Sequence, residues 1–116
     1  MAVVKLYGVP SCQQIRKTKA LFEEKNIPYD FINVKKHPAS EEFLREVVKQ
    51  VGLEKAVNTK GTTYRKLGLK QMDLNDEQLF QWLLKEQSMI KRPLIEKDGR
   101  FWIGFDPEGI LNFINR

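Results

Sequence analysis

VVKLYGVPSCQQIRKTKALFEEKNIPYDFINV, residues 3–34, contains a complete strand–helix–strand unit. Val3 to Tyr7 are mostly β-branched, aliphatic or aromatic residues, which predicts a short buried strand that ends at Gly8. Apolar residues after Ser11 recur at helical spacing, and residues 29–34 alternate as a second strand. Because a connection through one helix is almost always a right-handed crossover, we expect the two strands to lie parallel.

The middle of the chain predicts helices and no strand. Ser40 is a suitable N-cap, and the two glutamates that follow it complement the dipole of a helix. A polar loop and a short helical turn are expected over residues 58–67. Asn75 is a suitable N-cap for a further helix that contains Trp82, a side chain we expect to be packed in the core. The helical segment is predicted to span about residues 40–88.

The last quarter of the chain predicts a β-hairpin and a closing helix. Residues 94–96 and 100–103 flank an Asp-Gly dipeptide, which favours a tight turn between antiparallel strands. Asp106 is a suitable N-cap, and the proline after it suits the first position of a helix. The order of elements is therefore β-α-β, a helical segment, then β-β-α, which predicts an α/β fold.

Length and composition fit one domain, residues 1–116, with 41% hydrophobic residues to fill a core. The net charge is +5, but the basic residues are scattered. We therefore expect small anionic ligands rather than direct contact with nucleic acid. No apolar run approaches the ~18 residues that span a bilayer, and no signal-peptide pattern opens the chain. These features predict a cytoplasmic protein without a membrane partner.

Cys12 is the residue best suited to chemistry. If Ser11 is the N-cap, as its spacing from Gln14 predicts, Cys12 occupies the first position of the helix. The free N–H groups and the positive end of the helix dipole favour a thiolate at that position. Arg16, one turn further, adds a positive charge on the same side. The alternative is a small buried apolar filler, but the strand and the Gly-x-Pro-Ser turn before Cys12 favour a functional thiol.

Cys12 is also the only cysteine, and His37 is the only histidine. One cysteine excludes an internal disulfide and supplies too few thiolates for a structural zinc or iron–sulfur site, so we expect no bound metal or cofactor. A Cys-x-x-Cys motif would place its second thiol at position 15, which is Ile15. A disulfide at Cys12 must then be resolved from outside, by glutathione, a glutaredoxin-like partner or a second copy of the chain. His37 lies in a polar loop, and we assign it no catalytic role.

Three motifs resemble the arsenate reductase and Spx-like family, most closely its short YffB-like branch. They are YGVPSC (residues 7–12), NTKGTTYRKLG (residues 58–68) and SMIKRPLIE followed by IGF (residues 88–105). The resemblance implies a thioredoxin-like fold with a helical insertion, and a cis proline, Pro93, that faces the cysteine. It also implies that Cys12 is the nucleophile and that Arg92 matches one of the arginines that hold an oxyanion in arsenate reductases.

The chain departs from the family pattern at two further arginine positions. Asn58 and Gly104 lie near the places where arsenate reductases carry additional arginines. An arsenate ion with three oxygens requires several donors, so these departures argue against arsenate reduction. Spx-type regulators usually carry a Cys-x-x-Cys redox pair, which Ile15 interrupts.

The sequence therefore predicts a glutathione-linked thiol reductase or transferase, with glutathione as a co-substrate. The alternatives are an Spx-like interaction module that binds an RNA polymerase subunit, and an arsenate reductase proper. The expected catalytic residues are Cys12 and Arg92. Substrate binding is expected to involve Ser11, Arg16, Asn58, Thr59, Lys60 and Pro93.

Overall fold

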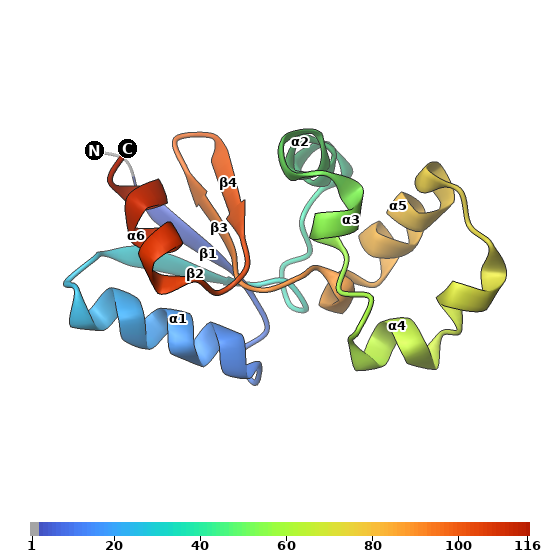
Figure 1. The fold of residues 1–116 in the computed structure, drawn as a ribbon, viewed down its shortest axis with the longest axis horizontal. Coiled ribbons are helices and arrows are strands. Elements are labelled where there is room, and N and C mark those ends of the chain that lie inside the picture. The colour runs from blue at the N-terminus through green and yellow to red at the C-terminus, as the bar shows by residue number, and fades with distance from the viewer. Residues whose placement is uncertain (1–2) are drawn as a thin grey trace.

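A computed structural model describes residues 3–116 and contains one four-stranded sheet of order β2-β1-β3-β4 (Figure 1). The strands are β1 (Val4–Gly8), β2 (Tyr29–Asn33), β3 (Leu94–Lys97) and β4 (Arg100–Ile103). Strands β1 and β2 are parallel, whereas β3 is antiparallel to both β1 and β4. The parallel pair and the hairpin predicted from the sequence are confirmed.

The helices divide between two parts of an elongated molecule with extents of 44 × 26 × 25 Å. In Figure 1, α1 and α6 lie beside the sheet, and the elements between β2 and β3 form the other end of the molecule. We call these parts the sheet half and the helical half. The helices are α1 (Gln13–Glu24), α2 (Glu41–Val51), α3 (Leu53–Ala56), α4 (Thr62–Lys66), η1 (Leu69–Met72), α5 (Asp76–Lys85), η2 (Gln87–Met89) and α6 (Pro107–Ile114). No helix among residues 3–116 is long and apolar enough to cross a membrane.

Each face of the sheet is covered by a separate apolar cluster. Leu6 and Ile95 are fully buried in the cluster that α1 and α6 form with the sheet. Leu94, Phe101 and Ile103 belong to the other cluster, with residues of α2, α3 and α5. Helices therefore cover both faces of the sheet, as is typical of α/β folds.

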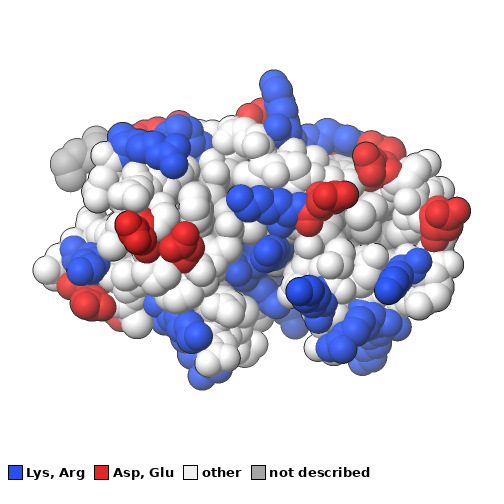
Figure 2. All heavy atoms as spheres, in the orientation of Figure 1, with Lys and Arg blue, Asp and Glu red and all other residues white. Residues whose placement is uncertain are grey.

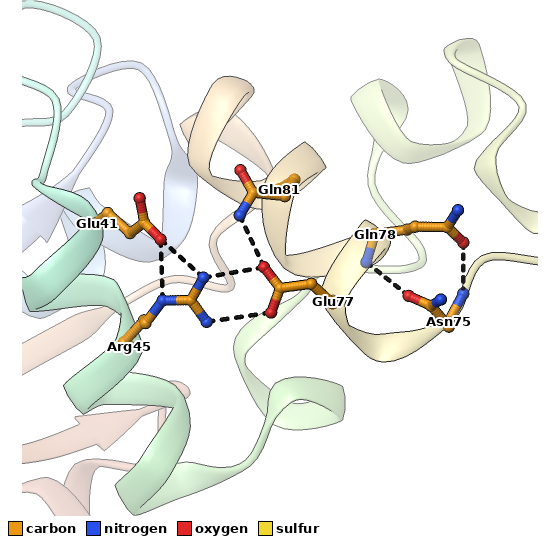
Figure 3. Close-up of polar contacts among 6 residues, drawn as sticks. All are labelled: Glu41, Arg45, Asn75, Glu77, Gln78 and Gln81. Carbon is orange, nitrogen blue, oxygen red and sulfur yellow. Dashed lines mark hydrogen bonds and ion pairs between the residues drawn. The ribbon is translucent and has the colours of Figure 1, made fainter.

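Most of the helix ends follow the predicted local signals. The Ser40 side chain accepts a hydrogen bond from Phe43, and Asp106 accepts one from Gly109. Asn75 and Gln78 form a reciprocal capping box, visible at the right of Figure 3. Trp82 departs from the prediction, because its ring is half-buried rather than enclosed, with the Lys85 Nζ atom 5.3 Å from the ring centre.

Two side-chain amides bond to backbone groups, Gln87 within the helical half and Gln50 between that half and the β3–β4 hairpin. Gln87 is buried, donates to the Ala39 carbonyl and accepts from the Ala39 N–H. Gln50 of α2 donates to the Gly99 carbonyl over 2.8 Å and accepts from the Phe101 N–H over 3.1 Å. Each amide therefore contributes a donor and an acceptor to backbone that would otherwise lack a protein partner.

An ion-pair bridge joins α2 to α5 on the surface of the helical half. The Arg45 guanidinium lies 2.7 Å from a Glu41 carboxylate oxygen and 2.9 Å from one of Glu77 (Figure 3). Gln81 donates a further hydrogen bond to Glu77. The Arg45 guanidinium also lies over the Phe80 ring, 4.3 Å from its centre. The same group therefore forms the ion pairs and a cation–π contact with α5.

Candidate functional site

Cys12 is the N-cap of α1, not its first helical residue, and this corrects the prediction that Ser11 would be the cap. The Cys12 N–H donates to the Val9 carbonyl over 3.0 Å, which closes a turn with Pro10 and Ser11 at its centre. Proline favours the second position of such a turn, so Pro10 places Ser11 within the turn and moves the start of the helix forward by one residue.

The Cys12 side chain lies where helix N-termini present free donors. It is half-buried and is the free cysteine of the chain. No side chain accepts from the first-turn N–H groups of α1, although an N-cap side chain is the group best placed to do so. A thiolate sulfur or a bound anion at this point would therefore meet both unpaired N–H groups and the positive end of the helix dipole.

Gly8 allows two elements of the site to approach the end of β1. A Cβ atom at this position would stand 2.3 Å from Ile15 Cδ1 and 3.7 Å from Arg92 Cγ. The first distance is far below van der Waals contact, so no larger residue fits unless the Ile15 side chain shifts. The second places the stem of Arg92 beside the strand end from which the Cys12 turn departs.

The Arg92–Pro93 peptide bond is cis, as the family resemblance implied. Pro93 is buried, and its carbonyl accepts a 3.0 Å hydrogen bond from the Gly104 N–H. Gly104 has φ of 107°, a conformation that side-chain-bearing residues rarely adopt, and its carbonyl accepts from the Trp102 indole. Glycine at position 104 therefore meets a backbone requirement, and an arginine there would be strained.

A cleft of about 170 Å³ lies between the β1–α1 turn and the helical half. Three of the predicted site residues, Ser11, Asn58 and Arg92, line it together. The other lining residues are Val9, Lys35, Gly61, Thr62, Thr63, Tyr64, Ser88 and Met89. Cys12 directly follows Ser11, so the thiol-bearing residue adjoins this cleft in the chain without being part of its lining.

Four predicted substrate-binding residues lie outside the lining of this cleft. Thr59 and Lys60 are exposed, and Arg16 is exposed with its guanidinium donating to the Ser11 carbonyl over 3.2 Å. Pro93 is buried behind Arg92. The sequence analysis missed Lys35, which follows β2, and Ser88, which lies four residues before Arg92.

Asn58 holds the shape of the loop that forms one wall. Its N–H donates to the Met89 carbonyl over 2.8 Å, and its side-chain oxygen accepts from the Lys60 N–H over 3.3 Å. A Cβ on Gly61 would stand 2.8 Å from the Asn58 side-chain nitrogen. The neighbouring bridge between Val57 and Ile90 fixes this loop against the segment that leads into Arg92.

Hydroxyl groups form much of the remaining wall. The Thr63 and Ser88 hydroxyls are 3.1 Å apart and hydrogen-bonded, and they come from α4 and η2. Thr62, Tyr64 and Ser11 contribute further hydroxyl-bearing side chains to the lining. Hydroxyls donate as readily as they accept, so this wall can adapt to an acceptor-rich ligand.

The charge of the cleft is positive. Lys35 and Arg92 line it, and none of its described lining residues is acidic. Among residues 3–116, the ion pairs are those of Arg45 with Glu41 and Glu77, so neither cation of the cleft has a carboxylate partner. Figure 2 shows basic side chains gathered along the boundary between the sheet half and the helical half. An anion is the ligand that this lining favours.

Comparison with known proteins gives matches over almost the whole chain. The model of the ArsC family matches residues 7–113. The chain belongs to the ArsC family. The YffB protein, of known structure, is 32% identical with a TM-score of 0.87 over 95% of this chain and 97% of its own. A possible arsenate reductase from Streptococcus mutans is 33% identical with a TM-score of 0.81 over 97% and 100% of the two chains.

A regulatory protein is a relative as well. The global transcriptional regulator Spx of Listeria innocua is 31% identical over 98% of this chain and 88% of its own length. The resemblance predicted from the sequence and the thioredoxin-like α/β fold are thus confirmed. The family contains both proteins described as arsenate reductases and regulators, so membership alone does not select the activity of this chain.

Proposed function

We propose that this protein is a glutathione-linked thiol–disulfide oxidoreductase in which Cys12 is the nucleophile. The observation that supports the proposal most directly is the half-buried Cys12 at the uncapped start of α1, next in the chain to Ser11 of the cleft that Arg92 lines. The thiolate is the attacking species in disulfide exchange, and the start of a helix presents free N–H groups to a negative charge. Membership of the ArsC family agrees with this role.

The proposed reaction is a pair of exchange steps. The Cys12 thiolate attacks one sulfur of a substrate disulfide, a new disulfide forms, and the other sulfur leaves as a thiolate. A thiolate of reduced glutathione then attacks the half of the mixed disulfide that is not Cys12. This step releases Cys12 as a thiolate, and the departing molecule is a mixed disulfide of glutathione and the substrate half. In solution, a second glutathione, alone or through a glutaredoxin-like partner, then attacks the glutathione sulfur of that mixed disulfide and frees the second substrate thiolate. The substrate thus gains two electrons, and the two glutathiones leave as oxidised glutathione.

The residues of the cleft have a binding role in this proposal. Arg92 holds a carboxylate of glutathione, while Ser11 and Asn58 line the same cleft and offer polar groups to it. Arg16 adds positive charge at the start of α1 while its guanidinium is bonded to Ser11. Pro93 fixes the backbone behind Arg92. Thr59 and Lys60 lie outside the cleft, and the proposal assigns them no contact with glutathione.

Intact-mass analysis after treatment with oxidised glutathione tests the proposal. The wild type should gain one glutathione, and Cys12→Ser should gain none. Arg92→Ala should slow the reaction about tenfold, because it removes charge-assisted hydrogen bonds to a carboxylate. Lys91→Ala is the matched control, since Lys91 is an exposed cation next to Arg92 that does not line the cleft. Equal rates for Arg92→Ala and the wild type would contradict the role of Arg92.

The second candidate is an interaction module that binds an RNA polymerase subunit. It is favoured by the match to the global transcriptional regulator Spx, which extends over 88% of that protein. Co-purification with RNA polymerase subunits, measured beside the glutathione reaction, separates the two candidates. Retention of a polymerase subunit by both the wild type and Cys12→Ser, without glutathione exchange by either, would favour the interaction module.

A further inference from the structure

The cleft beside the Cys12 turn differs in charge from four other clefts formed by the described residues. Four other clefts each include at least one acidic residue in their lining: Glu77 in two of them, Glu86 in the third, and Glu24 with Glu108 in the fourth. The cleft that contains Lys35 and Arg92 has cations, hydroxyls and an amide, and no carboxylate from the described residues. A ligand with a negative end would therefore prefer this cleft.

We propose that Lys35 and Arg92 together form a subsite for a free carboxylate, which makes carboxylate-bearing thiols and disulfides the preferred substrates of Cys12. This inference rests on the proposed function of Cys12 and adds a specificity-determining residue, Lys35. It also predicts that a disulfide of similar size without a carboxylate reacts more slowly.

The fold brings Lys35 to the cleft through the parallel strand pair. Gly8 of β1 lies opposite Asn33 of β2, and the Val34 N–H donates to the Gly8 carbonyl over 3.1 Å. The Lys35 N–H then donates to the Asn33 side-chain oxygen over 3.0 Å, which fixes the turn after β2. The carboxyl ends of parallel strands meet at one edge of a sheet, where open α/β sheets bind ligands. The turn that leads to Cys12 departs from the same edge.

The size of the cleft indicates that it holds an end group rather than a whole ligand. Its volume of about 170 Å³ is smaller than the ~300 Å³ at the lower end of small-molecule sites. A terminal carboxylate with one or two carbons fits such a space, with the remainder of the molecule outside. The adjoining cleft of about 180 Å³ shares Lys35 and Ser88 with it and also has Lys85 and Glu86 in its lining, so there a carboxylate of the protein competes with an anionic ligand for the lysines.

The test compares three disulfides as substrates for adduct formation at Cys12. These are oxidised glutathione, its form esterified at the glycine carboxylates, and bis(2-hydroxyethyl) disulfide, which has no charge. Rates are measured by intact mass at about 0.15 M ionic strength, where long-range attraction is screened beyond ~8 Å. The ratio of the rate with oxidised glutathione to the rate with the ester measures recognition of the carboxylate. In the wild type we expect a ratio of about ten or more.

Lys35→Gln should lower that ratio about threefold to tenfold, because one of the two cations is lost. Lys36→Gln is the matched control: it removes the same charge from an exposed neighbour that does not line the cleft, and its ratio should equal that of the wild type. Equal ratios for the two variants would overturn the role of Lys35. Equal wild-type rates with all three disulfides would overturn the carboxylate subsite while the proposed exchange at Cys12 stands. No adduct with any disulfide would overturn both.

Discussion

The Cδ1 atom of Ile15 lies 2.3 Å from the point that a Cβ atom on Gly8 would occupy. Ile15 is fully buried, and it stands where a Cys-x-x-Cys motif would carry its second thiol. The side chain at this position therefore packs α1 onto β1 and supplies no resolving group. The presence of isoleucine at position 15 therefore explains both why α1 packs closely on β1 and why the chain has no second thiol near Cys12.

Gly8→Ala should destabilise the fold by about 1–3 kcal/mol, because the added methyl group collides with Ile15. Ile15→Ala removes both colliding atoms, Cδ1 and Cγ1, and should cost about 2–5 kcal/mol alone. The double variant should then be more stable than the sum of the single effects predicts, with a coupling of at least about 0.5 kcal/mol. Urea denaturation of the four proteins measures this coupling. Additive effects would show that the strain at Gly8 is relieved elsewhere.

Ile15→Cys should allow a mixed disulfide on Cys12 to be resolved within the chain, by the new thiol, instead of by a second molecule. A thiol at position 15 can attack a mixed disulfide on Cys12 without waiting for a second molecule. After treatment with oxidised glutathione, the variant should lose two hydrogens in mass rather than gain a glutathione. The smaller side chain should cost about 1–3 kcal/mol of stability. Ile15→Ala is the control, and it should keep the glutathione adduct.

The protein should reduce arsenate slowly or not at all. Arg92 is the one arginine among the described residues that line the cleft, and Lys35 is its one lysine. Three oxygens of an arsenate ion need more donors in fixed geometry than this lining supplies. An assay with glutathione and a glutaredoxin, run beside a known arsenate reductase, measures this activity. Robust turnover would mean that the hydroxyl wall replaces the additional arginines.

The ion-pair bridge of Figure 3 should make part of the stability depend on pH. Hydrogen bonds from Arg45 and then Gln81 lower the pKa of Glu77 from 4.5 to about 2. Since the folded pKa is below the unfolded one, the stabilisation is present above pH 4.5 and is lost as the pH falls towards 2. Exposure and salt keep the effect small. The Tm difference between the wild type and Glu77→Gln should shrink over this range, whereas the same substitution made in an Arg45→Gln variant should show a much weaker trend, because the main hydrogen-bond donor is absent.

Local signals were sufficient for most of the fold. Ser40, Asn75 and Asp106 cap their helices because each side chain bonds to an N–H only three residues away. The assignment at Ser11 was wrong for an equally local reason, since Pro10 favours a turn that competes with the cap. Trp82 shows what the periodic spacing of apolar residues cannot predict. This spacing places the ring on the inner side of a helix, but it does not show how much of the ring the neighbouring elements cover.

The candidate site was only partly predictable. Arg92 and Asn58 lie within motifs that the sequence displays, and the structure brings both to one cleft with Ser11. Lys35 reaches that cleft through strand pairing, a relation that has no signature in the chain. Ser88 begins the motif that contains Arg92, but the packing of η2 that brings it to the cleft has no such signature. The sequence analysis treated Gly104 only as a position where the family carries an arginine. The structure shows that its positive φ favours glycine, and this backbone property could not be inferred from the sequence.

The side-chain amide of Gln50 protects the edge of the sheet against pairing with another molecule. Strand β4 is at the border of the sheet, where unpaired N–H and C=O groups can recruit a strand from another chain and begin aggregation. Gln50 bonds to Gly99 and Phe101 much as the peptide group of an added strand would. The helical half thereby closes this border with its own side chain, and strand addition from a neighbouring molecule must first displace α2.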